Sequence, residues 1–240
     1  MCGRYVRTLR SLDYVEPLMT DEGDPRLRSL RQAELELPPS WNVAPSQEEV
    51  IMAIRDGEAV WSKMEWGFRP KWATEEAPKQ INARCETADS KPYFRDAWKY
   101  RRVLLPADGW YEWKKLAGGK KAPYFIYPAD KTPMFFAGLA DGNGGFCILT
   151  RDAGGELGEI HNRCPVVLQG DGAVQWLTCG MTKEAPRAVL DQQVLPDGAF
   201  AWHQVGPAVG KPSNNGPGLI EPFRDPRQRP DDAFDAGPGE

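Results

Sequence analysis

Residues 49–64, EVIMAIRDGEAVWSKM, decide the fold class of this chain. Two runs, 49–55 and 58–64, are rich in β-branched and apolar residues that alternate with polar ones, a pattern typical of strands with one buried face. Asp56 and Gly57 stand between the runs, and an Asp-Gly pair supplies the two positive φ angles of a tight hairpin turn. The stretch therefore predicts an antiparallel β-hairpin.

The segments around this hairpin extend it into an α+β pattern. A second hairpin is predicted for residues 133–139 and 146–150, which flank the turn-forming sequence DGNGG. Further strands are predicted at 102–105, 123–127 and 165–168, and helices at 172–177 and 183–190. We expect an α+β fold, a single domain with a mixed, mainly antiparallel β core flanked by helices.

The limits of the domain follow from composition at the two ends of the chain. Residues 2–7 read as a strand that brings the N-terminus into the domain. Leu27, Leu30 and Leu35 recur at roughly helical spacing, which predicts one helix between the helix-breaking sequences Asp24-Pro25 and Pro38-Pro39. From about Pro207 the sequence is rich in Pro, Gly, Asn and Asp. We predict one catalytic and DNA-binding domain over 2–220 and a disordered tail over 221–240.

Composition excludes several classes of protein. Of the 240 residues 41% are hydrophobic and 27% charged, and no apolar run is long enough to span a membrane. The first residues lack a secretory signal core, so we expect a cytoplasmic, membrane-free protein. The five scattered cysteines form no Cys-x-x-Cys pair and the chain has two histidines. We therefore expect no disulfide framework, no metal site and no cofactor.

Cys2 carries a special chemical possibility because of its position. Removal of Met1 would create a 1,2-aminothiol, whose amine and thiol have reference pKa values of about 8 and about 8.5. The amine can form a Schiff base with an aldehyde, and the thiol can then close on the imine carbon to give a five-membered thiazolidine. An internal cysteine lacks the amine, so only a terminal one can trap an aldehyde in this way.

Six sequence blocks in order along the chain resemble the SRAP (SOS response-associated peptidase) family. Their agreement extends through most of the chain, although Cys164, Phe68 and Trp110 replace the more usual methionine, leucine and phenylalanine. The blocks are MCGR (1–4), WNVAP (41–45), MEWGFRP (64–70), INARCET (81–87), RR with PADGWYEW (101–113), and HNRCP (161–165).

The resemblance implies a function in the DNA damage response. Members of the family form a covalent crosslink with abasic sites, here a thiazolidine through Cys2 that shields the site in single-stranded DNA. It also implies removal of Met1 by self-cleavage, and the imine step permits a weak lyase activity. We accordingly expect abasic single-stranded DNA as the partner, a monomer, and a place at the nucleoid when DNA is bound.

Four catalytic roles are carried by the resemblance onto Cys2, Asn82, Glu112 and His161. Glu112, between two aromatic residues, suits proton transfer at the ring oxygen of the closed sugar. His161 suits a proton shuttle, and Asn82 can orient the amine or bind a sugar oxygen. Without the resemblance, a surface glutamate, a structural histidine and a turn residue would be the preferred interpretations of Glu112, His161 and Asn82.

Three residues are predicted to contact DNA: Arg4, Arg84 and Trp66. A guanidinium can hold two phosphate oxygens in one plane, and an indole can stack on a splayed base. The tryptophans at 72, 110 and 113 are assigned to packing. The net charge of −4 opposes non-specific coating of nucleic acid, so a local basic cleft is required.

The sequence leaves two other functions open. The chain also begins as class II glutamine amidotransferases do, with Cys-Gly after Met1, which would make it an N-terminal nucleophile amidohydrolase; residues 69–75, RPKWATE, lack the histidine of their motif. Alternatively, Cys2 is merely buried and the chain is a non-catalytic binder of single strands. Substitution of Cys2 by alanine separates the last possibility from a crosslinking function.

Overall fold

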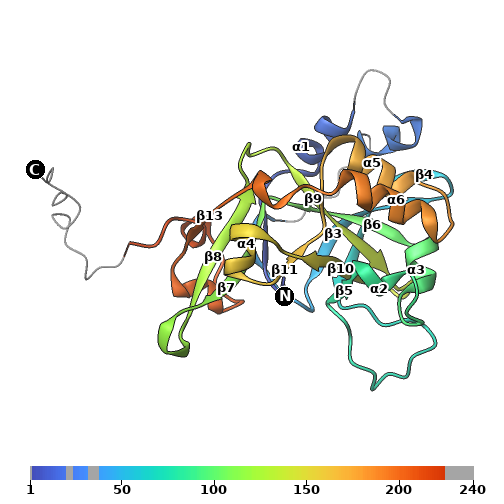
Figure 1. The fold of residues 1–240 in the computed structure, drawn as a ribbon. Helices are drawn as coiled ribbons and strands as arrows, with labels where there is room; N and C mark the ends of the chain where they lie inside the picture. The colour runs from blue at the N-terminus through green and yellow to red at the C-terminus, as the bar shows by residue number, and fades with distance from the viewer. Residues whose placement is uncertain (1, 20–23, 32–37, 225–240) are drawn as a thin grey trace, which may run out of the picture.

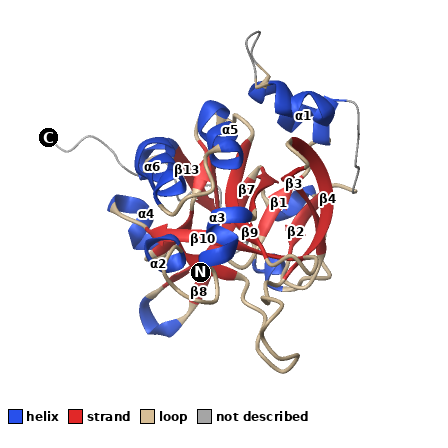
Figure 2. Ribbon diagram, turned by 90° about the vertical axis from the view of Figure 1, so that its right-hand side faces the viewer, coloured by secondary structure: helices blue, strands red, loops and turns tan. Residues whose placement is uncertain are grey.

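The computed structural model describes residues 2–19, 24–31 and 38–224. Within them the chain forms two β-sheets with helices on the outside (Figures 1 and 2). Both sheets are built mainly from antiparallel pairs, which confirms the predicted α+β class. No helix in this part of the chain is long and apolar enough to cross a membrane.

The first sheet holds five strands in the order β13-β8-β7-β1-β2. All of its neighbouring pairs are antiparallel. The strands are β1 (Tyr5–Arg7), β2 (Ser40–Val43), β7 (Gly109–Lys115), β8 (Lys121–Pro128) and β13 (Phe200–Gln204). The predicted N-terminal strand is therefore confirmed, and it lies inside the sheet between β7 and β2.

The second sheet has the order β11-β10-β4-β3-β6-β9-β12, and a further β10–β9 pairing closes its central strands into a ring. Its parallel pairs join β10 to β4 and to β5. The strands are β3 (Glu48–Arg55), β4 (Glu58–Trp66), β5 (Asn82–Arg84), β6 (Arg102–Ala107), β9 (Met134–Ala140), β10 (Gly145–Asp152), β11 (Arg163–Pro165) and β12 (Val167–Leu168).

The two predicted hairpins are confirmed in this sheet. In β3–β4, Arg55 pairs with Glu58 across a two-residue turn, and Asp56 and Gly57 both have positive φ, 50° and 86°. These are the angles that match the twist of the flanking strands. The second hairpin joins β9 to β10. The strands predicted at 102–105 and 123–127 are β6 and β8, and the one at 165–168 is divided between β11 and β12.

The helices are short and lie around the sheets. The predictions at 172–177 and 183–190 are confirmed as α5 (Gly170–Thr178) and α6 (Glu184–Gln193). The predicted leucine helix is a 3-10 helix, η2 (Pro25–Arg31), while Leu35 lies outside the described residues. The others are α1 (Ser11–Val15), η1 (Glu16–Leu18), α2 (Cys85–Ala88), α3 (Arg95–Tyr100), η3 (Ala117–Gly119), α4 (Gly155–Ile160), η4 (Asp197–Ala199), η5 (Pro207–Gly210) and η6 (Pro217–Leu219).

A core of aromatic and aliphatic side chains that includes Cys2 joins the two sheets. In it the Tyr5 ring of β1 packs edge-on against Trp66 of β4, with 5.4 Å between centroids, and against Phe136 of β9 at 5.5 Å. These contacts draw the N-terminal segment inward, and Figure 1 shows the N-terminus among β5, β7, β10 and β11. Cys2, the first described residue, is fully buried as a result.

The C-terminal segment covers the outer face of the first sheet. Val205 and Val209 are fully buried and pack with Tyr111 and Phe125 of that sheet. Residues 221–224 are described, and the Phe223 N–H donates to the Gln204 carbonyl at 2.8 Å. The rest of the tail predicted for 221–240 lies outside the described residues, and the domain limits stay predictions.

Candidate active site

Cys2 lies at the centre of a group of buried polar side chains. Its exposed fraction is 0%, and it is held in place because β1 pairs with β7 through Tyr5 and Trp110. Burial raises the pKa of the Cys2 thiol well above its usual value, and the nearby charge of Glu112 raises it further. The sulfur is therefore a neutral thiol at pH 7, and its attack on carbon requires a base to accept the proton.

Asn82 holds the Cys2 backbone. It opens β5, where it pairs with Ile148 of β10, and its Nδ2 donates to the Cys2 carbonyl at 2.8 Å. Its Oδ1 is buried and accepts no hydrogen bond from any residue that the structure describes. A buried acceptor without a donor is costly, so Asn82 both positions Cys2 and presents a carbonyl oxygen to an incoming N–H or O–H group.

Glu112 supplies a carboxyl group with an unusual pKa. It lies on β7 opposite Tyr124, and its exposed fraction is 2%. Burial raises the pKa of Glu112 from its ordinary 4.5 to about 7, although the Trp113 backbone acts in the opposite direction. Near neutral pH both the acid and the carboxylate are present, which suits a group that must give and take protons.

His161 ends α4, which packs against β7. Nδ1 of His161 lies 3.0 Å from the Arg163 backbone nitrogen and 3.1 Å from the Arg163 carbonyl oxygen, so the Arg163 backbone holds this edge of the ring in either tautomer. Burial lowers the pKa of His161 below its ordinary value. The imidazole is accordingly neutral at pH 7, with one ring nitrogen as a donor and the other as an acceptor.

A buried arginine fixes the segment between His161 and the site. Arg163 donates to both oxygens of Glu86, at 2.8 and 3.0 Å, and to Asp152 at 2.6 Å. It also donates to the Thr150 carbonyl at 2.6 Å. Since its backbone contacts Nδ1 of His161, this network fixes the orientation of the imidazole. Arg163 stands in the HNRCP block, but no role was predicted for it.

Cys164 is a second thiol in this cluster that sequence reasoning did not place there. It is 1% exposed, and burial raises its pKa to about 12, with a further contribution from Glu112. Cys164 in turn contributes to the raised pKa of Cys2. Only the chain topology brings positions 2, 112 and 164 together, so no local sequence signal could have revealed this neighbour.

The two predicted phosphate ligands differ in their surroundings. Arg84 is exposed on β5, two residues after Asn82, so the alternation of side chains along a strand puts both on one face of the sheet. Arg4 instead donates to Asn42 Oδ1 at 2.8 Å and to the carbonyls of Val209 and Gly210 at 2.7 and 3.1 Å. The Arg4 guanidinium thus braces the C-terminal segment against the site, and both DNA contacts remain predictions.

The assignment of the tryptophans was wrong at two positions. Trp66 is fully buried, stacks on Phe146 at 6.4 Å and donates from Nε1 to the Ile81 carbonyl at 2.8 Å, so it is a core residue that cannot stack on a base. Trp72, assigned to packing, is 63% exposed and rests edge-on against Tyr93 at 5.8 Å. Its flanking proline and lysine, in RPKW, were the available sign of a surface loop.

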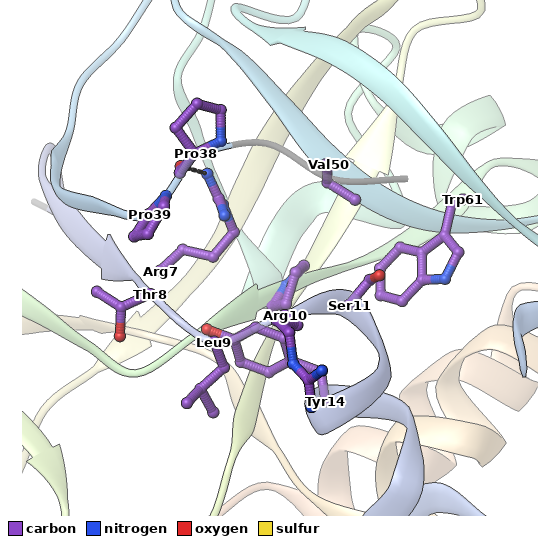
Figure 3. Close-up of a pocket in the computed structure, with 11 residues that line it drawn as sticks. Arg7, Thr8, Leu9, Arg10, Ser11, Tyr14, Pro38, Pro39, Val50 and Trp61 are labelled. Carbon is purple, nitrogen blue, oxygen red and sulfur yellow. Dashed lines mark hydrogen bonds between the residues drawn. The ribbon is translucent and has the colours of Figure 1, made fainter. Parts of the chain in front are cut away.

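A cavity of about 360 Å³ lies near the opposite end of β1 from Cys2 (Figure 3). Arg7 lines it, but its Nε is committed to Glu49 at 2.7 Å and another nitrogen to the Pro38 carbonyl at 3.0 Å. This cavity is separate from the group around Cys2. Across residues 2–19, 24–31 and 38–224, no cluster of three His, Cys, Asp or Glu side chains could hold a metal ion.

Comparison with known proteins places this geometry in a family. The model of the family described as SOS response associated peptidase (SRAP) matches residues 1–212. Abasic site processing protein YedK of Escherichia coli is 34% identical over 92% of this chain and 100% of its own length. Abasic site processing protein YoqW of Bacillus subtilis is 36% identical over 92% and 99%. Abasic site processing protein HMCES of Xenopus tropicalis is 29% identical over 90% and 77%.

Solved structures agree with the sequence matches. A phage-related protein of Bordetella bronchiseptica superposes with a TM-score of 0.69 at 31% identity, over 85% of this chain and 94% of that one. A protein of Bacteroides thetaiotaomicron shares the fold, with a TM-score of 0.72 at 21% identity over 93% and 100%. The resemblance of the six sequence blocks is confirmed, and the chain belongs to the SRAP family.

Proposed function

We propose that this chain processes abasic sites in single-stranded DNA by forming a thiazolidine between the abasic aldehyde and Cys2 after Met1 is removed. The observation that carries the proposal is the burial of Cys2 beside Glu112 and Asn82. It is supported by relatives that are named abasic site processing proteins and that match more than nine tenths of the chain.

The first step is opening of the closed sugar. The ring oxygen must gain a proton while the anomeric hydroxyl loses one, and Glu112, with a pKa of about 7, is available in both protonation states at neutral pH. The neutral imidazole of His161, whose Nδ1 lies against the Arg163 backbone, can exchange a proton with a sugar oxygen through Nε2 during this step. The product is a free aldehyde inside a site that excludes bulk water.

Two bonds then form to the aldehyde carbon. The Cys2 amine adds to the carbonyl and one water leaves, which gives the imine, and Asn82 Oδ1 can accept an N–H of the attacking amine. The Cys2 sulfur next adds to the imine carbon while its proton passes to the ring nitrogen, with Glu112 as the base that relays it. The net reaction joins protein and DNA with loss of one water and requires no oxidant.

The remaining parts of the function are proposals on the same basis. Arg84, and Arg4 on release from the C-terminal segment, would bind phosphates next to the abasic nucleotide. Trp72 takes the stacking role because it is the exposed indole and Lys71 flanks it. The proposal also includes self-cleavage of the bond after Met1 and a weak β-elimination lyase activity. The protein acts as a monomer.

Denaturing gel electrophoresis tests the proposal. Processed protein is mixed with abasic single-stranded, abasic double-stranded or intact DNA, and we expect a denaturation-stable band only with abasic DNA and most strongly with the single strand. A variant that retains Met1 should give none, because its Cys2 amine is tied up in a peptide bond. An equal band with intact DNA would overturn the proposal, whereas glutamine hydrolysis without a band would favour an amidohydrolase.

A further inference from the structure

A lysine-rich hairpin stands beside the site and takes no part in the chemistry above. The lysine hairpin, as we name residues 114–121 with the sequence KKLAGGKK, joins β7 to β8. Gly118 and Gly119 have φ angles of 74° and 77°, and no atom lies within 4 Å of where a Cβ would stand on either. The turn therefore extends into solvent, and in Figure 1 it is the light green loop at the lower left.

Two charges of this hairpin, those of Lys115 and Lys121, oppose its own stability. Lys115 and Lys121 stand directly opposite each other in the β7–β8 ladder, and both are exposed. Like charges at such positions repel, and residues 113–128 contain no Asp or Glu that could neutralise them. Lys114 alone has an acidic neighbour among the described residues, Glu159 of α4, with 3.6 Å between Nζ and Oε2. A repelling pair that the fold leaves exposed is better explained by an anionic partner than by structure.

The lysine hairpin is linked to the active site through two elements. Lys115 lies three residues beyond Glu112 on the same strand, about 10 Å along it, and projects from the other face of the sheet, whereas Lys114 shares the face of Glu112. The Lys114–Glu159 ion pair joins the hairpin to α4, the helix that His161 terminates. Burial is the largest cause of the lowered pKa of His161, and the positive charges of Lys121 and Lys115 lower it further. The hairpin is thus within electrostatic range of the imidazole.

We propose that the lysine hairpin binds the phosphates of the DNA strand that flanks the abasic nucleotide held at Cys2. The proposal rests on the proposed function, since it takes the direction of the strand from the position of the aldehyde. Lysine ammonium groups bind phosphates as point charges without reading sequence. The hairpin supplies a local positive field in a chain whose net charge is −4, and such a field attracts a polyanion.

The test compares a Lys115→Gln/Lys121→Gln variant with a matched control, Lys63→Gln/Lys183→Gln. The control lysines are also exposed, and they belong to β4 and to the start of α6, which lie far from the hairpin in Figure 1. Binding of an intact single-stranded oligonucleotide is measured by fluorescence anisotropy over a range of salt concentrations. We expect the hairpin variant to bind about tenfold more weakly at low salt, with a salt slope smaller by about 1.4, since each single-strand phosphate contact contributes about 0.7.

Two further arms make the outcome decisive. A Lys115→Arg/Lys121→Arg variant should restore the affinity, and failure to restore it would mean that charge is not the cause. An affinity and salt slope equal to those of the control variant would likewise overturn the proposal. Intact DNA carries no aldehyde, so loss of binding is separable from loss of the Cys2 adduct. If no adduct forms in the native protein while the hairpin effect persists, the proposed function fails and the phosphate contact stands.

Discussion

Replacing Glu112 by glutamine should change stability and activity in a pH-dependent way. The pKa of Glu112 is raised by burial from 4.5 to about 7, which corresponds to about 3 kcal/mol between the two protonation states. The unfolded chain releases this proton near pH 4.5 and the folded protein near pH 7. Between these values the folded state holds more protons, so Glu112 makes stability fall as pH rises through the interval.

The Glu112→Gln variant lacks this titration because its amide stays neutral at every pH. Its free energy of unfolding, measured by urea titration, should match the native protein within about 1 kcal/mol near pH 4.5 and exceed it by about 3 kcal/mol above about pH 7. A glutamine cannot exchange protons, so the rate of adduct formation should fall by about 10²- to 10⁴-fold. The exposed Glu156, changed to glutamine, serves as the control.

Two results would refute this reasoning. A stability difference that stays constant between about pH 4.5 and about pH 8 would mean that the carboxyl group is not desolvated in the folded protein. An adduct rate equal to that of the Glu156→Gln control would mean that Glu112 moves no proton in the reaction. Because the two assays are independent, one can fail without the other.

Three further predictions follow from the described contacts. Asn82→Ala removes the 2.8 Å hydrogen bond to the Cys2 carbonyl, and single-turnover adduct formation should slow at least tenfold with a stability loss of only about 1 kcal/mol; an unchanged rate would contradict its positioning role. Trp72→Ala should weaken single-strand binding by about 1–3 kcal/mol in anisotropy titrations, whereas Trp66→Ala should lower the free energy of unfolding by about 3–5 kcal/mol in urea titrations. A Trp72→Ala variant that binds normally, or a Trp66→Ala variant with native stability, would contradict these assignments. Arg163→Met removes the hydrogen bonds that this buried guanidinium donates to Glu86, Asp152 and the Thr150 carbonyl; because the two carboxylates are 40% and 83% exposed, unfolding should become easier by only about 1–3 kcal/mol, and an unchanged stability would argue against the network.

The fold class could be predicted because its main signals are local. The β3–β4 hairpin shows period-2 alternation and an Asp-Gly turn within sixteen consecutive residues, and both hold in the structure. Short strands such as β2 and β5 carry too few residues for a periodicity to appear. Each forms along one neighbour that is distant in sequence, β2 along β1 and β5 along β10, and that neighbour supplies its hydrogen-bond partners.

The surroundings of the site residues could not be predicted from local patterns. Trp66 follows an alternating strand pattern and Trp72 follows RPK, yet the family resemblance drew the DNA contact to Trp66; its burial depends on the packing of β10, which places Phe146 against it. Arg4 is likewise engaged by carbonyls that lie 205 and 206 residues along the chain. Such contacts depend on the complete topology, whereas the identities of the candidate residues came from the family resemblance.

Mass spectrometry of the denatured reaction mixture tests the central claim most directly. Processed protein and abasic single-stranded DNA should give one covalent species whose mass is their sum less one water, with the crosslinked peptide beginning at Cys2 and no borohydride required. Cys2→Ser should give a species only after borohydride reduction, because it can form the imine but not the sulfur-containing ring. A stable, unreduced adduct in Cys2→Ser, or an adduct that maps to another residue, would contradict the account.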